Sequence, residues 1–297
     1  MARLAEKLTG ERTPFVVAIV VRAQHPTSVR PGDAAIVRAD GSIDGFVGGV
    51  CAESSVRLQS MRVLETGEPV LLRLDPEGEE GTEIIEDASR EGVVVAHNPC
   101  LSGGELEIYL EPRLPAPRLA VAGRTPIAHA LADLGPRVGF DPVDVSGRGA
   151  DVDEGVAAVV VAAHGRDEEP VLEAALRLGV PYVGLVASTR RGEAVRESLD
   201  VPDELRAQLH CPAGLAIEAR TPEEIALSIL AEIVAERHRA PSEAPSRPGP
   251  AVAIDPVCGM EVAVSEASLH LDLDGERQYF CSEHCRERFA AEHAHHG

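Results

Sequence analysis

Three cysteines near the C-terminal end of the sequence have the residue type and spacing of metal ligands. Cys258 lies in a turn rich in proline and glycine, and Cys281 and Cys285 follow four positions apart. On a helix, Cys281 and Cys285 would be one turn apart and point the same way. Thiolates suit zinc or copper(I). We therefore predict a metal site that Cys258, Cys281 and Cys285 form together.

The fourth ligand of this site is left open by the sequence. A structural zinc ion takes four ligands, and a histidine, a water molecule or an open position would complete the set. The histidines in this part of the chain are His270, His284, His293, His295 and His296. The alternative is that the three thiols are small buried groups packed against Phe280 and Phe289.

A second group of reactive residues follows a glycine-rich turn. Gly48 and Gly49 precede Cys51 and Glu53. A helix that begins near Gly49 would offer free amide groups to an anion, and the pKa of the Cys51 thiol would be lowered in its first turn. Glu53 would act as an acid, a base or a hydrogen-bond acceptor. On spacing alone, a glycine turn beside a buried cysteine is slightly favoured.

Short apolar runs separated by turn signals predict the elements around this turn. A hairpin signal, Ala39-Asp40-Gly41, joins two of the strands, and a helix is predicted from Cys51 to about Glu65. The predicted strands are Phe15–Arg22, Ala35–Arg38, Ser42–Phe46, Val70–Leu74, Val93–Ala96 and Leu106–Leu110. We assign residues 1–113 to an α+β domain.

The middle of the chain alternates apolar strands with short helices. The predicted strands are Leu119–Ala122, Val143–Val145, Val156–Ala163 and Tyr182–Val186, and the predicted helices are Pro126–Leu134 and Glu168–Leu178. A capping box at Thr221 begins a last helix. This alternation predicts an α/β domain with a parallel sheet, over residues 114–239.

Composition divides the chain further and excludes several classes of function. Apolar residues make up 44 %, which is enough for packed cores. The net charge of −21 argues against nucleic-acid and anionic-membrane binding. No apolar run approaches the ~20 residues that span a bilayer, and the N-terminus has no hydrophobic signal segment. We therefore expect a cytoplasmic protein with reduced cysteines.

A proline-rich linker over 240–250 leaves a small module at 251–297. A module of this size has little core and needs a stabilising staple, such as a bound metal ion.

The small module resembles a known family. DPVCGM followed by YFCSEHC and a later phenylalanine is similar to the YHS domain, a metal-associated module, over about residues 254–292. The resemblance implies Cys258, Cys281 and Cys285 as ligands. It leaves zinc and copper as the candidate ions.

The rest of the chain resembles the XdhC/CoxI family of molybdenum-hydroxylase maturation factors. GFVGGVCAES is similar to the family's GGCxE signature, and YVGLVASTRR and HCPAGLAIEARTPEEIALSILAEIV resemble its C-terminal, Rossmann-like domain. The resemblance covers about residues 12–237. It implies binding of the molybdenum cofactor, with Cys51 and Glu53 at the positions of the family's Cys and Glu. A pterin pyrophosphate at the Gly48-Gly49 turn would agree with the anion site.

The sequence also departs from the family pattern. Val50 replaces the glycine before the cysteine, and Ser102 replaces a second family cysteine. Cys100 lies two residues earlier, before Gly103 and Gly104, and either takes over that role or is a buried loop thiol. These residues are candidates for the cofactor site.

The nucleotide fingerprint of the middle domain is incomplete. After Gly123, Thr125 replaces the second glycine of G-x-G-x-x-G and adds a side chain where phosphate would sit. We therefore expect no strong NAD(P) binding. His164, at the end of a predicted strand, corresponds to a family histidine and is a further cofactor-site candidate, with a structural loop histidine as the alternative.

Together these resemblances imply an accessory chaperone rather than an enzyme. It would bind molybdenum cofactor, assist its sulfuration and insert it into a xanthine- or CO-dehydrogenase-type hydroxylase, with a cysteine desulfurase as a second candidate partner and a homodimer as the favoured assembly. Two alternatives are an NAD(P)-dependent oxidoreductase built on the Rossmann-like domain and a cytosolic metal or redox sensor.

Overall fold

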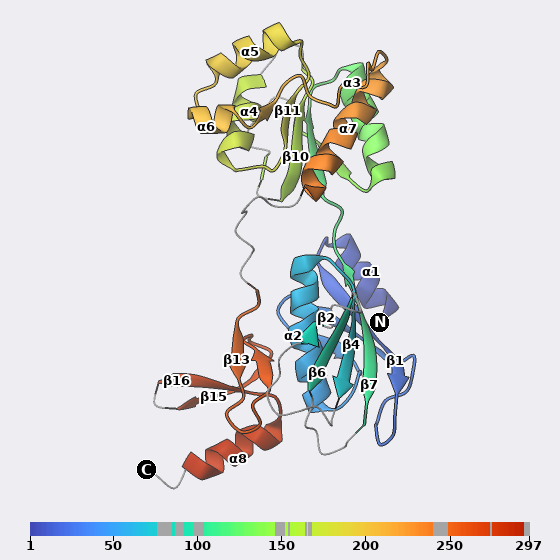
Figure 1. The fold of residues 1–297 in the computed structure, drawn as a ribbon, viewed down its shortest axis with the longest axis vertical. Helices are drawn as coiled ribbons and strands as arrows, with labels where there is room; N and C mark the ends of the chain where they lie inside the picture. Colours follow the sequence, from blue (N-terminus) through green and yellow to red (C-terminus); the bar gives the residue numbers. More distant parts are fainter. Residues whose placement is uncertain are drawn as a thin grey trace. The chain divides into compact units, whose positions relative to one another are not determined.

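The computed structural model describes two compact units. Its described residues are 1–75, 85–86, 92–97, 104–145, 152–153, 155–163, 165, 168–239, 249–273 and 275–293. Unit 1 combines Met1–Pro115 with Glu243–Gly297, and unit 2 is Ala116–Ser242 (Figure 1). Unit 1 therefore contains segments from both the N-terminal and the C-terminal part of the sequence.

The N-terminal part of unit 1 is built on a mixed seven-stranded sheet. The strand order is β3-β2-β1-β7-β4-β6-β5. β1 pairs antiparallel with both β2 and β7, whereas β4 and β6 run parallel. The strands are β1 (Phe15–Ala23), β2 (Ala34–Arg38), β3 (Ile43–Gly45), β4 (Val70–Asp75), β5 (Ile85–Glu86), β6 (Val93–His97) and β7 (Leu106–Arg113).

A helix covers each face of this sheet. α2 (Val50–Thr66) packs Val56 and Val63 against the face that carries Val16 of β1. Because side chains alternate along a strand, Phe15 lies on the opposite face, where Leu8 of α1 (Ala2–Gly10) covers it. The sheet thus holds the start of α2 firmly at one edge of a packed core.

The C-terminal part of unit 1 consists of two antiparallel strand pairs and a helix. β13 (Val252–Ile254) pairs with β14 (Glu261–Ala263), and β15 (Leu269–Leu273) pairs with β16 (Glu276–Phe280), before α8 (Glu283–His293). The buried residues of its small core are Met260, Val262, Phe280, Cys281 and Cys285. Two of these five buried core residues are thiols, so the core and the predicted metal site are the same place.

α2 also contacts this C-terminal part. Arg62 Nη2 lies 3.1 Å from Glu261 Oε2 of β14, and Cys51 packs against the small C-terminal core. Cys51 and Arg62 lie on one stripe of the helix, three turns apart. α2 is therefore buried on two sides, by the sheet and by β14.

Unit 2 is a doubly wound α/β domain. Its five strands are parallel, in the order β12-β11-β10-β8-β9. They are β8 (Arg118–Ala122), β9 (Asp141–Asp144), β10 (Val156–Val161), β11 (Val183–Leu185) and β12 (Leu209–His210). The strand order changes direction between β8 and β10, which is where ligands bind in folds of this type.

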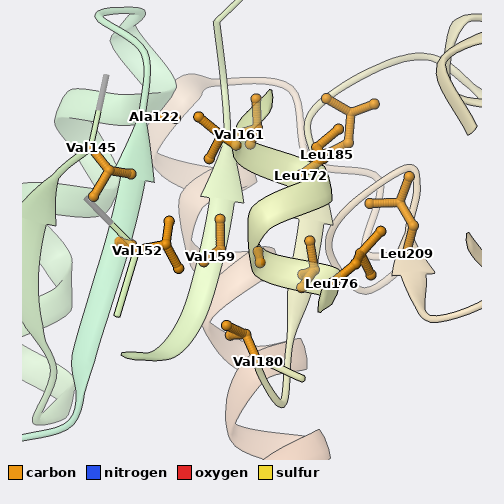
Figure 2. Packing of buried hydrophobic residues seen from close by; sticks show 14 of the residues in the cluster. Ala122, Val145, Val152, Val159, Val161, Leu172, Leu176, Val180, Leu185 and Leu209 are labelled. Atoms are coloured by element: carbon orange, nitrogen blue, oxygen red, sulfur yellow. The ribbon is translucent and has the colours of Figure 1, made fainter. Parts of the chain in front are cut away.

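Helices cover both faces of this parallel sheet. α4 (Glu168–Arg177) packs Leu172 and Leu176 against the face that carries Val159 (Figure 2). α3 (Pro126–Leu134) and α7 (Pro222–His238) cover the other face, which carries Val160. The remaining helices are the 3-10 turn η1 (Gly135–Val138), α5 (Thr189–Ser198) and α6 (Asp203–Arg206).

The predicted fold class is confirmed: an α+β N-terminal region, a Rossmann-like parallel-sheet domain and a small C-terminal module. The helix Pro126–Leu134 was predicted to the residue, whereas α1 was not predicted. The linker predicted over 240–250 lies outside the described residues except for Gly249 and Pro250. None of the helices in the described part of the chain is long and apolar enough to cross a membrane.

Candidate functional site

The three predicted metal-ligating cysteines meet in the core of the C-terminal part. Cys258 Sγ lies 3.5 Å from Cys281 Sγ, which lies 3.7 Å from Cys285 Sγ. Cys258 comes from the turn between β13 and β14, Cys281 directly follows β16, and Cys285 lies in the first turn of α8. Two sequence-distant turns thus converge on one group of sulfur atoms.

One detail of the prediction was wrong, because Cys281 does not lie on the helix. α8 begins only at Glu283. The hydroxyl of Ser282 accepts a hydrogen bond from the Cys285 amide at 3.3 Å, so this serine caps the helix. The two thiols still meet, since the strand end delivers one and the capped first turn delivers the other.

Asp255 is a member of the group that the sequence analysis missed. Its fully buried carboxylate accepts hydrogen bonds from the amides of Val257 at 2.9 Å and Cys281 at 2.8 Å. Burial acts to raise the pKa of Asp255, but the hydrogen bonds outweigh it and hold the pKa below its ordinary value. The short Asp255–Val257 turn is the sequence signal that could have revealed it.

The donor atoms fit a thiophilic metal ion. Ligand atoms of Asp255, Cys258, Cys281 and Cys285 all lie within 4.8 Å of one another. Zinc–sulfur bonds of about 2.3 Å in a tetrahedron place two sulfur atoms about 3.8 Å apart, close to the distances found here. The histidines His270, His284 and His293 are not members of this group, and His295 and His296 lie outside the described residues.

The three thiols have different pKa values because their hydrogen bonds and their burial differ. A hydrogen bond with Cys281 lowers the pKa of Cys258, whereas burial raises the pKa of Cys285 to about 11. The hydrogen bond with Cys258, one with Cys51 and burial raise the pKa of Cys281. Cys258 therefore has the lowest pKa of the three thiols, and binding of a cation here would require the other two to release their protons.

The glycine turn places Cys51 in the first turn of α2, as predicted. Gly49 is the residue before the helix, and no side chain caps the helix start by a hydrogen bond. Gly48 has a φ of +144°, and a Cβ there would meet Ala52 Cβ at 2.7 Å. The turn therefore needs a glycine at position 48 and leaves the helix N-terminus without a side-chain cap.

Cys51 and the C-terminal thiols line one cavity of about 430 Å³ within unit 1. Val50 and Cys51 enter from α2, and Cys258, Cys281 and Cys285 enter from the C-terminal part. The sequence placed these cysteines in two separate sites. The structure brings them to a single cavity.

Glu53 lies one half-turn beyond Cys51 and is half-buried. Burial raises the pKa of its carboxyl group, and Arg57 offsets part of this effect. A carboxyl group with a raised pKa takes part in proton transfer more readily at neutral pH. The geometry thus keeps the acid–base role open for this residue.

Of the other residues predicted for the cofactor site, Gly104 lies within the part of the chain that the structure describes. Gly104 packs so closely that a Cβ would meet Pro26 O at 2.3 Å, so its glycine serves a close backbone contact. Cys100, Gly103 and His164 lie outside the described residues. Their roles stay predictions.

The incomplete nucleotide fingerprint has a structural explanation. Thr125 is the residue before α3, and its hydroxyl accepts a hydrogen bond from the Ala128 amide at 3.2 Å. Gly123 allows β8 to approach β10, because a Cβ there would meet Ala162 O at 2.2 Å. Thr125 therefore serves as the N-cap of α3.

Unit 2 carries a cavity of about 610 Å³ beyond the carboxyl ends of β11 and β12. Ser188, Arg191 and Gly214 are among its lining residues, and Arg191 forms an ion pair with the buried carboxylate of Glu168. No site was predicted at these segments. The position of Ser188 shortly after the predicted strand Tyr182–Val186 was the available signal, since ligands bind at the carboxyl ends of such strands.

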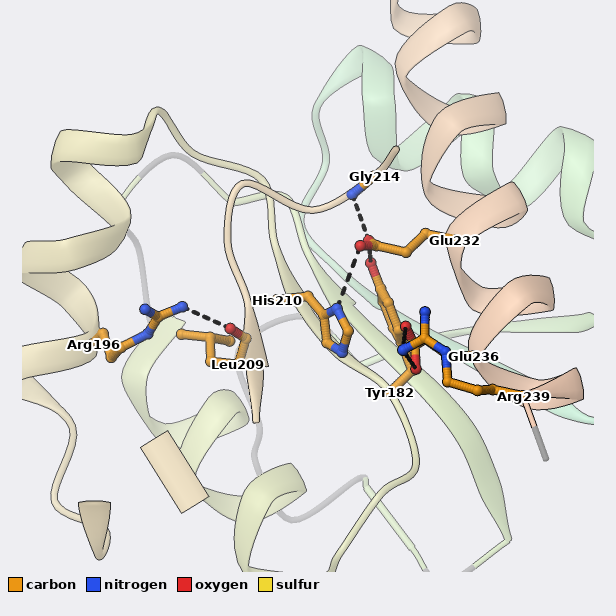
Figure 3. Close-up of polar contacts among 8 residues, drawn as sticks. All are labelled: Tyr182, Arg196, Leu209, His210, Gly214, Glu232, Glu236 and Arg239. Carbon is orange, nitrogen blue, oxygen red and sulfur yellow. Dashed lines mark hydrogen bonds and ion pairs between the residues drawn. The ribbon is translucent and has the colours of Figure 1, made fainter. Parts of the chain in front are cut away.

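A hydrogen-bond network holds α7 against the strands beside this cavity (Figure 3). The Tyr182 hydroxyl donates to Glu232 Oε2 at 2.6 Å, and the Gly214 amide donates to the same oxygen at 2.7 Å. Tyr182 stacks on His210 with 4.4 Å between ring centroids. Burial raises the pKa of Tyr182 far above its ordinary range, so the hydroxyl stays protonated and donates.

The fold and the site describe a protein with an α+β domain, a doubly wound α/β domain and a small module whose three cysteines form a candidate metal site. Three family models match the chain in this order: the XdhC and CoxI family at residues 8–75, the XdhC Rossmann domain at 119–233 and the YHS domain at 253–295. The chain therefore belongs to the XdhC and CoxI family and carries a YHS domain, as its motifs predicted.

Two of the curated relatives are proteins of Escherichia coli. The chain is 28 % identical over 265 residues to the uncharacterized protein YqeB of Escherichia coli, covering 80 % of this chain and 46 % of YqeB. It is 25 % identical over 278 residues to the molybdenum cofactor insertion chaperone PaoD of E. coli, covering 77 % of this chain and 85 % of PaoD. The chain thus spans less than half the length of YqeB.

Two further proteins are similar to parts of the chain by these comparisons. A probable xanthine dehydrogenase subunit from Bacillus subtilis is 32 % identical over 83 residues, which are 28 % of this chain and 24 % of that protein. A crystal structure titled as a xanthine dehydrogenase from Bacillus halodurans is 19 % identical with a TM-score of 0.40, covering 82 % of this chain and 97 % of that one.

Proposed function

We propose that this protein is a maturation chaperone that binds the molybdenum cofactor and delivers it to a molybdenum hydroxylase of the xanthine- or CO-dehydrogenase type. The observation that carries the proposal is the position of Cys51, in the first turn of α2 directly after the Gly48-Gly49 turn. Membership of the XdhC and CoxI family supports it. So does the likeness to PaoD, which is named as an insertion chaperone for this cofactor.

The residues around Cys51 fit such a cofactor. When bound, the cofactor supplies a thiophilic molybdenum centre and a phosphate group. The start of α2 has no side-chain cap, and open space surrounds Gly49, so an anion can approach the helix N-terminus. Cys51 offers a soft sulfur ligand, and Glu53, half a turn further along α2, has a carboxyl group with a raised pKa.

The finer parts of the proposal concern sulfuration and partners. A sulfuration role, with a cysteine desulfurase as partner, agrees with a nucleophilic thiol at position 51. Unit 2, with its cavity beyond the carboxyl ends of β11 and β12, would receive the client enzyme. We also propose a homodimer in the cytoplasm, as the family resemblance implies.

Deletion of the gene in its own host tests the proposal. We expect the host's molybdenum hydroxylase to accumulate without activity and without cofactor, and the wild-type gene to restore it. Molybdoenzymes of other classes serve as the control and should keep full activity, since cofactor synthesis itself is intact. A fully active, cofactor-loaded hydroxylase in the deletion strain would contradict the proposal.

A further inference from the structure

Cys51 lies against the YHS thiols, although more than two hundred residues separate it from them in the sequence. It packs against the core that contains Met260, Cys281 and Cys285. It also lines the same cavity as all three YHS cysteines. Four of the chain's six cysteines are therefore collected at one place.

The contact between α2 and the YHS domain, which brings Cys51 to the three YHS thiols, includes a partly buried ion pair. Arg62, three turns further along α2, pairs with Glu261 of β14 at 3.1 Å, and each side chain is only 27 % exposed. Gly41 approaches the YHS domain so closely that a Cβ would meet Ser265 Oγ at 2.8 Å. Two separate contacts thus hold α2 and the turn at Gly41 against the YHS domain.

Asp255 is a less favourable fourth ligand than a thiolate, because a thiophilic ion prefers sulfur to carboxylate oxygen. Both of its carboxylate oxygens already accept backbone hydrogen bonds, from Val257 and from Cys281. These bonds fix the two turns that carry Cys258 and Cys281. Asp255 therefore positions two of the thiols, and Cys51 is the fourth thiol that lines the cavity.

We propose that Cys51 supplies this fourth donor, so that a thiophilic cation is bound by Cys51, Cys258, Cys281 and Cys285 across the contact between the XdhC N-terminal domain and the YHS domain. An all-sulfur donor set selects zinc(II) or copper(I) over hard cations such as magnesium. Each thiol releases its proton on binding, and no electron transfer is required. This site does not depend on the proposed cofactor function.

Metal loading of the full chain tests the proposal. The reduced, metal-free protein receives one equivalent of zinc(II) or, separately, of copper(I) without oxygen, and X-ray absorption counts the sulfur ligands. With the ion that the site selects, we expect four sulfur ligands in the wild type and three in Cys51→Ser, with an affinity at least about tenfold lower. Cys211→Ser is the matched control, because Cys211 is a half-buried thiol of unit 2, and it should equal the wild type.

A charge exchange at the interface provides a second test that leaves every thiol in place. Arg62→Glu should lower the affinity for the cation, since it opposes the contact that positions Cys51. Adding Glu261→Arg in the same chain restores the pair and should restore the affinity. Equal sulfur counts in the wild type and Cys51→Ser with both ions would overturn the proposal, and so would an affinity that Arg62→Glu leaves unchanged.

Discussion

Gly48 and Gly49 are neighbours at the start of α2, yet they meet different steric demands. Gly48 has a φ of +144°, a conformation that L-residues rarely adopt, and a Cβ at this position would lie 2.7 Å from Ala52 Cβ. Gly49 has a φ of −71°, and a Cβ would meet nothing within 4 Å. The first glycine therefore shapes the turn, and the second leaves space beside the helix N-terminus.

Substitution by alanine should separate these two roles. We expect Gly48→Ala to lower the free energy of unfolding by about 1–3 kcal/mol, because it adds backbone strain and a close contact. Gly49→Ala should cost less than about 1 kcal/mol, since only the preference for glycine before a helix is lost. Urea-induced unfolding of the full chain measures both, and equal losses would contradict this account of the turn.

The grouping of the three C-terminal thiols was predictable from the sequence. The type and spacing of Cys258, Cys281 and Cys285 indicated a thiol group, which the fold brings together. The role of Asp255 was not predictable in the same way. Its importance comes from hydrogen bonds to amides in two separate turns, and one of these turns is distant in the sequence.

At the scale of elements, α7 is fixed to the sheet of unit 2 by a buried polar network. Glu232 accepts hydrogen bonds from the Tyr182 hydroxyl and the Gly214 amide. Tyr182 is only 2 % exposed, so its hydroxyl has little access to water. The helix, β11 and the loop after β12 are thereby tied together beside the unit 2 cavity.

Removal of this carboxylate should loosen the helix. We expect Glu232→Ala to lower the free energy of unfolding by about 1–3 kcal/mol, because it leaves a buried hydroxyl and an amide without their acceptor. Glu236→Ala, one turn later on α7, is the matched control. Its partner Arg239 is 70 % exposed, so that change should stay within about 0.5 kcal/mol. Similar losses in both variants, measured by urea-induced unfolding, would refute a structural role for the network.

Among the helices with local start signals, α3 and α7 were predicted, whereas α5, which Ser188 caps, was not. Pro126–Leu134 carries its own cap and proline, so its bounds follow from the sequence. α1 has no side-chain cap, and its burial against Phe15 follows from the sheet. The burial of α2 on a second side depends on β14, far along the chain, and no local pattern indicates it.

At the scale of the molecule, unit 1 joins segments from both ends of the sequence. The sequence analysis assigned Cys51 to a cofactor site and Cys258, Cys281 and Cys285 to a metal site. The fold places all four thiols around one cavity of about 430 Å³. Cys51 is therefore part of both the proposed cofactor site and the proposed metal site.

The most direct test of the proposed function measures cofactor retention. The full chain, freed of metal by a chelator, is incubated without oxygen with molybdenum cofactor released from a molybdoenzyme and then passed through a gel-filtration column. The retained pterin is oxidised to its fluorescent derivative and counted per chain. We predict that the wild type and Cys211→Ser retain pterin and that Cys51→Ser retains at least about tenfold less, equivalent to about 1.4 kcal/mol of binding free energy. A wild type without pterin, or equal retention by Cys51→Ser, would contradict the account.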